Sequence, residues 1–221
     1  IQNMTFRKVS IVTDDNSEKD ASVYRLKADS NGNIWVGSYG NGLFRYNTQS
    51  EIWESYEDTF GKVIISDILI TSDQVVWAIC SDKNIYRYNA GRNEFNAIPI
   101  MDKFTRRSIG HAVCCCQDSY GDIWICDDNA DLYRLDLTDM LCVASKLQTS
   151  EEKILARIII EYKTGELIIG TNTGILSFDT AQRKYHWIDR GERQYNGKLN
   201  DKFIHALVKD RDDGLWVGTY F

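Results

Sequence analysis

Three pairs of adjacent carboxylates could take part in acid–base chemistry: Asp14-Asp15, Asp127-Asp128 and Asp212-Asp213. An enzyme that cleaves a glycosidic bond needs two carboxyl groups on opposite sides of its substrate. Neighbours along a chain rarely flank a substrate in this way. The pairs therefore favour solvated turns over a catalytic dyad.

The histidines and the motifs give no stronger catalytic pattern. His111, His186 and His205 are far apart in the sequence and favour structural or surface roles over metal binding or base catalysis. The sequence contains no GxSxG, Walker A, HExxH or GxGxxG motif. We therefore predict no catalytic residue, no bound metal and no cofactor.

The cysteines favour packing over chemistry. No CxxC pair occurs, so a zinc site has little support, and a chain of this length does not need disulfides to fold. The cysteines are Cys80, Cys114, Cys115, Cys116, Cys126 and Cys142. We predict that these cysteines are small hydrophobic residues buried in the core. If residues 114–116 form a strand, Cys114 and Cys116 face one side of it and Cys115 the other.

Composition indicates a folded, acidic chain. The 221 residues are 43% hydrophobic and 12% aromatic, which is enough for a core in one large domain or two small ones. The net charge of −6 argues against duplex nucleic acid or an anionic membrane as partner. No apolar run approaches the ~20 residues that span a bilayer. The chain begins without Met, so we expect a processed or excised piece.

A repeated block is the main structural signal. Alignment of the copies on Trp35, Trp77, Trp124, Ile168 and Trp216 gives spacings of 42, 47, 44 and 48 residues. A second block follows each of the first four anchors after seven or eight residues. Its copies are Leu43 to Asn47, Ile85 to Asn89, Leu132 to Asp136 and Ile175 to Asp179. Two blocks in register across four copies indicate a tandem repeat.

Each repeat has the composition of strands and tight turns. In the first copy we predict strands over Val23 to Ala28, Ile34 to Gly37, Leu43 to Tyr46 and Ile52 to Tyr56, with a turn at 30–33. Four antiparallel strands per ~40–45 residues are typical of a β-propeller blade. The prediction is an all-β propeller with no notable helix.

The repeat count predicts about five blades, or part of a larger propeller. The predicted blades are 14–57, 58–99, 100–148, 149–189 and an incomplete 190–221, all in a single propeller fragment spanning 1–221. The segment Met4 to Val12 could supply an outer strand of an earlier blade. Exposed blade faces and strand edges would favour a homodimer.

Two recurring positions invite a physical explanation. A small residue stands two places after the anchor at Gly37, Gly170 and Gly218, where we expect close backbone approach. Arginines recur in the second block, at Arg45, Arg87 and Arg134. They could form a ring of cations for an anionic ligand. Repetition at one strand position instead favours a structural hydrogen bond or ion pair, with the stem packed on an aromatic ring.

The repeat resembles the two-component regulator propeller repeat. The pattern is Asp-x-x-Gly-x-Ile-Trp-Val-Gly, a glycine-rich step, then Leu-x-Arg-Tyr-Asn/Asp. Asp29 to Asn47 matches it best, followed by Asp118 to Asp136 and Asp210 to Thr219. The copy at Trp77 lacks the glycine and the aspartate, and the copy at Ile168 lacks the tryptophan.

The resemblance implies the periplasmic sensor region of an inner-membrane hybrid two-component histidine kinase. In that family the propellers adjoin further propellers and an Ig-like domain, and many sensors respond to oligosaccharides. The function expected from the resemblance is non-catalytic ligand sensing. The alternatives are a propeller lyase or hydrolase acting on glycans, and a protein–protein interaction scaffold. No nucleic acid or membrane contact is expected for this segment.

Ligand contacts are expected on the face where second-to-third-strand turns and blade-to-blade connections meet. The candidates in the turns are Tyr39, Asn41, Asp82, Lys83, Asp127, Asp128, Asn129 and Asn172. The longer connections add Arg106, Arg107, Arg193 and Tyr195. This mixture of aromatic, amide and charged groups would suit a sugar, and it would equally suit any solvated loop surface.

Overall fold

The computed structural model describes residues 8–12, 18–128, 131–146, 154–189 and 201–220. These residues form antiparallel sheets and one helix of four residues. The chain divides into two compact units, 1–65 and 66–221, and each unit is described by itself. Among the described residues, no helix has the length and apolar character needed to cross a bilayer.

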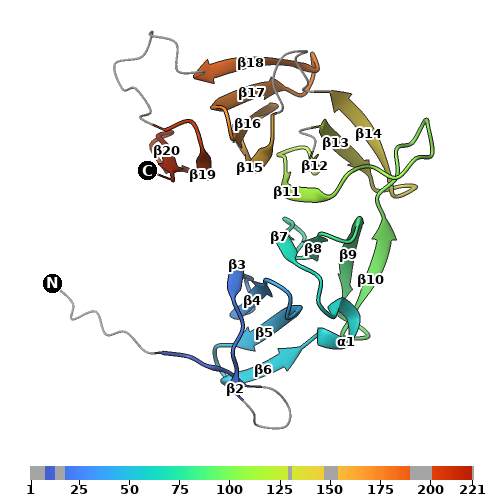
Figure 1. The fold of residues 1–221 in the computed structure, drawn as a ribbon, viewed down its shortest axis with the longest axis vertical. Coiled ribbons are helices and arrows are strands. Elements are labelled where there is room, and N and C mark those ends of the chain that lie inside the picture. Colours follow the sequence, from blue (N-terminus) through green and yellow to red (C-terminus); the bar gives the residue numbers. More distant parts are fainter. Residues whose placement is uncertain (1–7, 13–17, 129–130, 147–153, 190–200, 221) are drawn as a thin grey trace, which may run out of the picture. The chain divides into compact units, whose positions relative to one another are not determined.

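The first unit contains one four-stranded meander (Figure 1). Its strands are β3 (Val23–Ala28), β4 (Asn33–Ser38), β5 (Leu43–Asn47) and β6 (Ile52–Ser55), in that order across the sheet. These bounds agree with the predicted strands to within one residue at each end. Local signals were sufficient here because turn residues separate short runs of β-branched and aromatic residues.

The segment before this meander differs from the prediction. Strand β1 (Ile11–Val12) pairs only with β2 (Glu18–Lys19), in a separate two-stranded sheet. Its Ile11 side chain packs against Val36 and Phe44. The described end of Met4 to Val12 is thus a small hairpin and not the outer strand of a blade, and residues 4–7 lie outside the described residues. The unit also contains the short helix α1 (Glu57–Phe60).

The second unit repeats the same meander. Its first sheet contains β7 (Ile65–Ile70), β8 (Val76–Cys80), β9 (Asn84–Asn89) and β10 (Glu94–Pro99). The second sheet contains β11 (Ala112–Gln117), β12 (Ile123–Asp127), β13 (Asp131–Asp136) and β14 (Leu141–Lys146).

Two further sheets complete the second unit. One contains β15 (Ala156–Lys163), β16 (Glu166–Thr171), β17 (Ile175–Asp179) and β18 (Lys184–Asp189). The other has two strands, β19 (Ile204–Lys209) and β20 (Leu215–Thr219). The first strands of successive sheets are neighbours, with β11 beside β15 and β15 beside β19 (Figure 1). Sheets joined through their first strands are the blades that the repeat predicted.

The core of the second unit lies between consecutive sheets. Every residue of β8 and β12 is buried, because these middle strands are covered on both faces. Cys115 packs toward the preceding sheet with Trp77 and Ile125. Cys114 and Cys116 pack toward the following sheet. The predicted division of the three cysteines between the two faces is therefore confirmed.

All six cysteines are buried, which confirms their predicted role as small packing residues. Burial raises the pKa of the Cys142 thiol to about 12. Burial also raises the pKa of Cys116 well above its usual range. These thiols stay protonated at neutral pH and contribute volume to the core.

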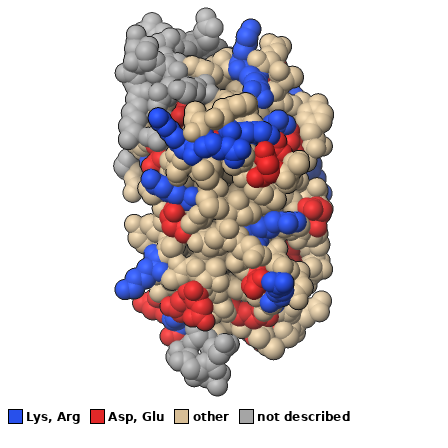
Figure 2. Space-filling view, turned by 90° about the vertical axis from the view of Figure 1, so that its right-hand side faces the viewer, with Lys and Arg blue, Asp and Glu red and all other residues tan. Residues whose placement is uncertain are grey.

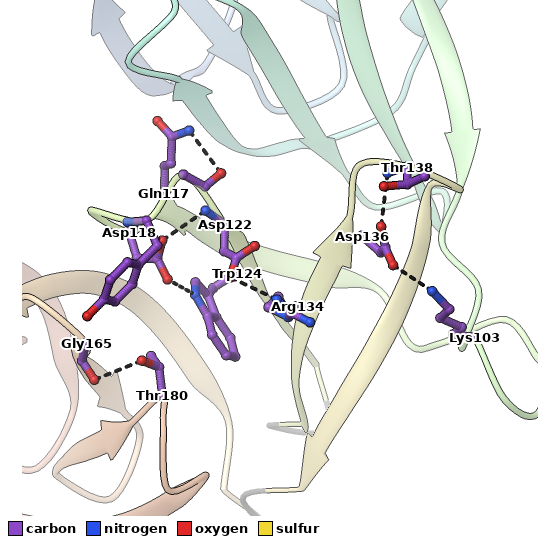
Figure 3. A network of polar contacts seen from close by, with 12 residues as sticks. Lys103, Gln117, Asp118, Asp122, Trp124, Arg134, Asp136, Thr138, Gly165 and Thr180 are labelled. Atoms are coloured by element: carbon purple, nitrogen blue, oxygen red, sulfur yellow. Dashed lines mark hydrogen bonds and ion pairs between the residues drawn. The ribbon is translucent and has the colours of Figure 1, made fainter.

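An aspartate six residues before the tryptophan anchors three of the repeats. The indole Nε1 donates to the carboxylate in the pairs Trp35–Asp29 (2.9 Å), Trp124–Asp118 (2.7 Å) and Trp216–Asp210 (2.7 Å). The other carboxylate oxygen accepts two backbone N–H groups of the intervening turn in each case. The carboxylate thus fixes the turn and the indole together (Figure 3).

Candidate functional site

Five of the predicted contact residues lie at the ends of second strands in the second unit. Asp82 and Lys83 follow β8, Asp127 ends β12 and Asp128 follows it, and Asn172 follows β16. The turns therefore occupy the same place in each sheet, after its second strand. Asn129, Arg193 and Tyr195 lie outside the described residues.

The acidic residues of the β12–β13 turn hold backbone in place. Asp127 is 1% exposed and accepts hydrogen bonds from the backbone N–H groups of Gly110 (3.2 Å) and Asp131 (2.9 Å). The carboxylate of Asp128 accepts from the backbone N–H of His111 at 3.0 Å. Both side chains therefore tie the turn to the entry of β11.

The neighbouring turns use their polar side chains in the same way. The Tyr86 hydroxyl donates to Asp82 at 2.6 Å, and burial, followed by this hydrogen bond, raises the pKa of Tyr86 above its usual range. The Asn172 carboxamide oxygen accepts from the backbone N–H of Leu155 at 2.7 Å. The exposed Lys83 has φ of 65°. The side chains of these turns therefore bind neighbouring parts of the chain. Lys83 is the most accessible of the predicted contact residues in these turns.

The predicted contacts of the first unit lie on the β4–β5 turn. Tyr39 is 61% exposed, and its ring lies edge-on to Tyr24 at a centroid distance of 6.5 Å. The backbone N–H of Asn41 donates to the Ser38 hydroxyl at 2.9 Å. Tyr39 therefore presents an accessible aromatic ring on a turn that the Asn41–Ser38 hydrogen bond stabilises.

Arg106 and Arg107 lie elsewhere in the second unit. They belong to an excursion between β10 and β11 that forms bridges between Met101 and Ser108 and between Asp102 and Cys142 of β14. Figure 1 shows this excursion beside β14. Lys103 ties it to the β13–β14 turn through Asp136 at 2.6 Å (Figure 3). That turn lies at the opposite end of the strands from Asp82, Asp127 and Asn172. The structure therefore does not bring the two arginines together with the other candidates.

The arginines of the third strands mostly make structural contacts, as their repetition indicated. Arg45 binds Glu54 at 2.5 Å, and its guanidinium lies 5.5 Å from the Trp35 ring. Arg134 binds Asp122 at 3.0 Å (Figure 3). Arg87 lies 5.7 Å from the Trp77 ring. The structural interpretation is confirmed for Arg45 and Arg134.

Two adjoining clefts open between the sheets β7–β10 and β11–β14. Their volumes are about 370 Å³ and about 530 Å³. Arg87, Asp73 and Met140 line both clefts. The lining comes from first-to-second and third-to-fourth-strand turns, at the opposite end of the strands from the predicted turn residues. Sequence reasoning missed this site because it depends on two sheets whose equivalent residues, such as Trp77 and Trp124, are 47 positions apart.

In the described part of the chain, no group of three or more His, Cys, Asp or Glu side chains could hold a metal ion. On the face shown in Figure 2, basic and acidic side chains lie next to one another, so this face does not present a single sign of charge.

The architecture defines a β-propeller class of protein, and two stretches of the sequence match a known family model. Residues 17–40 and 198–221 each match the family model described as two component regulator propeller. The chain therefore contains two stretches that match the two component regulator propeller model. No curated protein matches the sequence.

Solved structures with the same fold include proteins of different functions. The extracellular domain of BT4673 from B. thetaiotaomicron, assigned to a hybrid two component system, is 20% identical with a TM-score of 0.69. PorZ of Porphyromonas gingivalis, a surface component of the type-IX secretion system, is 19% identical with a TM-score of 0.68. Virginiamycin B lyase from Staphylococcus aureus is 16% identical with a TM-score of 0.70.

The matches cover most of this chain and only part of the proteins compared. Each covers 90% of this chain. The shares of the matched chains are 28% for BT4673, 31% for PorZ and 64% for the lyase. At these identities the likeness establishes the propeller fold.

Proposed function

We propose that the chain is a non-catalytic, extracytoplasmic ligand-sensing propeller of a hybrid two-component signalling protein that responds to an oligosaccharide. The observation that carries the proposal is the pair of family repeats at 17–40 and 198–221. Support for the extracytoplasmic location comes from BT4673, whose compared part is an extracellular domain. The proposed location is the periplasmic side of an inner membrane.

The engagement of the turn carboxylates supports sensing over catalysis. Asp127 and Asp128 each accept backbone hydrogen bonds, and Asp82 accepts from the Tyr86 hydroxyl. A general acid or base must be free to exchange a proton with a substrate. Side chains occupied in this way are better suited to fixing a rigid surface, on which exposed groups such as Lys83 contact a ligand.

Binding would act on signalling by favouring one arrangement of domains over another. A ligand shifts such an equilibrium only as far as its affinities for the two arrangements differ. The partners in this proposal are a neighbouring propeller or Ig-like domain of the same polypeptide, and a second copy of the chain.

Calorimetric titration with a panel of neutral and acidic oligosaccharides tests the proposal. The protein should be the complete extracytoplasmic region that contains this chain. We expect saturable binding of at least one panel member at a defined stoichiometry. Absence of binding across the panel would contradict the proposal.

A glycan-cleaving propeller is the second candidate, favoured by the fold that the chain shares with virginiamycin B lyase. This candidate predicts products from a bound oligosaccharide, whereas the sensor leaves it intact. A protein-binding scaffold is the third candidate, favoured by the likeness to PorZ. It predicts no saccharide binding and a stable complex with another protein.

A further inference from the structure

Arg87 differs from its equivalents in the other repeats. Arg45 and Arg134 each form an ion pair, with Glu54 and Asp122. In the described part of the chain, Arg87 has no carboxylate within ion-pair distance, and its contact is with the Trp77 ring at 5.7 Å. The second unit therefore presents a guanidinium whose usual intramolecular partner is missing.

The pairing of strands explains the difference. Arg45 faces Glu54 across β5 and β6, and the corresponding partner of Arg87 across β9 and β10 is Asn96. Asp122, which binds Arg134, stands two residues before Trp124, and the corresponding residue before Trp77 is Val75. Both positions that supply an acid to the other arginines are thus neutral here.

The place of Arg87 makes this charge accessible to a ligand. Its side chain is exposed, and it lines both clefts between the sheets β7–β10 and β11–β14. Gln117 fixes the turns around the smaller cleft, accepting from the Ser72 backbone N–H at 2.7 Å and donating to the Gly121 carbonyl at 3.2 Å. The guanidinium therefore opens into a hollow whose walls are held in place.

The other lining groups suit a ligand that carries hydroxyls. Asn89 and Asn96 supply amides that can both donate and accept. Asp73 lines both clefts, accepts from the Thr71 hydroxyl at 2.5 Å and offers carboxylate oxygens to ligand hydroxyls. Asp73 and Arg87 form no ion pair with each other in the described structure. Volumes of about 370 and 530 Å³ accommodate one or two sugar rings.

We propose that this cleft binds an anionic sugar through its carboxylate or sulfate group, with Arg87 as the anion-binding residue. A guanidinium fork matches the two oxygens of a carboxylate or sulfate, and such charge-assisted pairs are among the stronger hydrogen bonds. The ligand anion takes the place that Glu54 occupies at Arg45. The inference rests on the proposed ligand-sensing function and specifies the class of its ligand.

The test is calorimetric titration at 50 mM NaCl with three acidic ligands: trigalacturonate, trimannuronate and a sulfated chondroitin disaccharide. The neutral trimethyl ester of trigalacturonate is the matched ligand control. We expect an acidic ligand to bind. The neutral ester should bind roughly tenfold more weakly or not at all. Raising NaCl to 300 mM should weaken binding of the acid and leave that of the ester unchanged.

Three variants separate the role of Arg87 from general destabilisation. Arg87→Gln should weaken binding of the acid roughly tenfold or more. Asn96→Glu should do the same by supplying the cross-strand partner seen at Arg45, without lowering the thermal unfolding midpoint. Arg134→Gln, at the matching position of the next sheet, should leave the affinity unchanged.

The outcomes distinguish the inference from the proposed function. Equal binding of acid and ester, equal binding by wild type and Arg87→Gln, or binding of neutral oligosaccharides alone would overturn the Arg87 site and leave the sensing function intact. If no acidic or neutral saccharide binds, both the Arg87 site and the proposed sensing function are overturned.

Discussion

Gly170 lies directly against Ile204 of the next sheet. A Cβ atom built on Gly170 would lie 2.5 Å from Cγ2 of Ile204 and 2.8 Å from Cγ2 of Ile158. Real Cβ atoms do not approach other carbons so closely. The glycine two residues after the repeat anchor therefore lets β19 pack against β16, as the sequence led us to expect for this position.

The Gly170→Ala variant should lower the free energy of unfolding by about 1–3 kcal/mol, because the added methyl overpacks the junction with Ile204. Urea unfolding followed by circular dichroism measures the change. Gly91→Ala is the matched control, since its Cβ would lie 3.5 Å from the nearest atom, the Asn89 side-chain oxygen. A Gly170→Ala protein as stable as the control would show that the packing is looser than described.

The Asp118→Ala variant should be strongly destabilising. Asp118 is 5% exposed and accepts from Trp124 Nε1 and from the backbone N–H groups of Tyr120 and Asp122. Its loss leaves the buried indole N–H of Trp124 and two part-buried backbone N–H groups without their acceptor, at a cost of about 2–4 kcal/mol. Urea unfolding measures this change as well.

The Asp210→Ala variant provides the comparison. Asp210 makes the same three contacts, but its partner Trp216 is 67% exposed. Water can replace an exposed acceptor, so the loss of stability should be smaller than for Asp118→Ala. Equal losses in the two variants would show that burial does not determine the strength of the aspartate–indole contact.

Removal of the Lys103 ammonium should raise the pKa of Asp136. The hydrogen bond from Lys103, followed by that from the Thr138 backbone N–H, lowers the pKa of Asp136 to about 2. The unfolded value is about 3.9, so this carboxylate stabilises the fold above about pH 4, and the contribution is lost as the pH falls from about 4 to 2. In Lys103→Met, carbon-detected NMR titration should show a pKa closer to 3.9. The Lys83→Met control should leave it at about 2, and an unchanged value in Lys103→Met would refute the ion pair.

The native protein should resist thiol alkylation. All six cysteines are buried, and burial raises the pKa of Cys142 to about 12. Because the thiolate is the reactive form, iodoacetamide at pH 8 should add slowly to the folded chain and to all six positions after unfolding in urea. Intact-mass spectrometry counts the adducts. Rapid labelling of the folded chain would show that a thiol is accessible.

The sequence was sufficient for features set by local patterning. Strand β3 spans Val23–Ala28, as predicted, because a polar turn follows a short run that contains the apolar residues Val23, Tyr24 and Leu26. The division of Cys114 and Cys116 from Cys115 followed from the period of a strand alone. Repetition also indicated the structural role of Arg45 and Arg134.

Features set by distant contacts could not be read in this way. The excursion that carries Arg106 and Arg107 is placed by a bridge between Asp102 and Cys142, forty residues along the chain. The cleft at Arg87 depends on which residues face it from β10 and from the next sheet. The sequence signal for this cleft is a difference between repeats, because Asn96 and Val75 replace acids present in other repeats. This difference can be recognised once the strand register is known.

The most direct test of the account is the fate of a bound oligosaccharide. The complete extracytoplasmic region would be incubated with each ligand that binds in calorimetry, and the ligand would be recovered and weighed by mass spectrometry. We predict that every ligand is recovered at its original mass after an incubation many times longer than its residence time on the protein. Release of shorter or unsaturated products at a rate proportional to protein concentration would contradict a sensing role and support the enzyme.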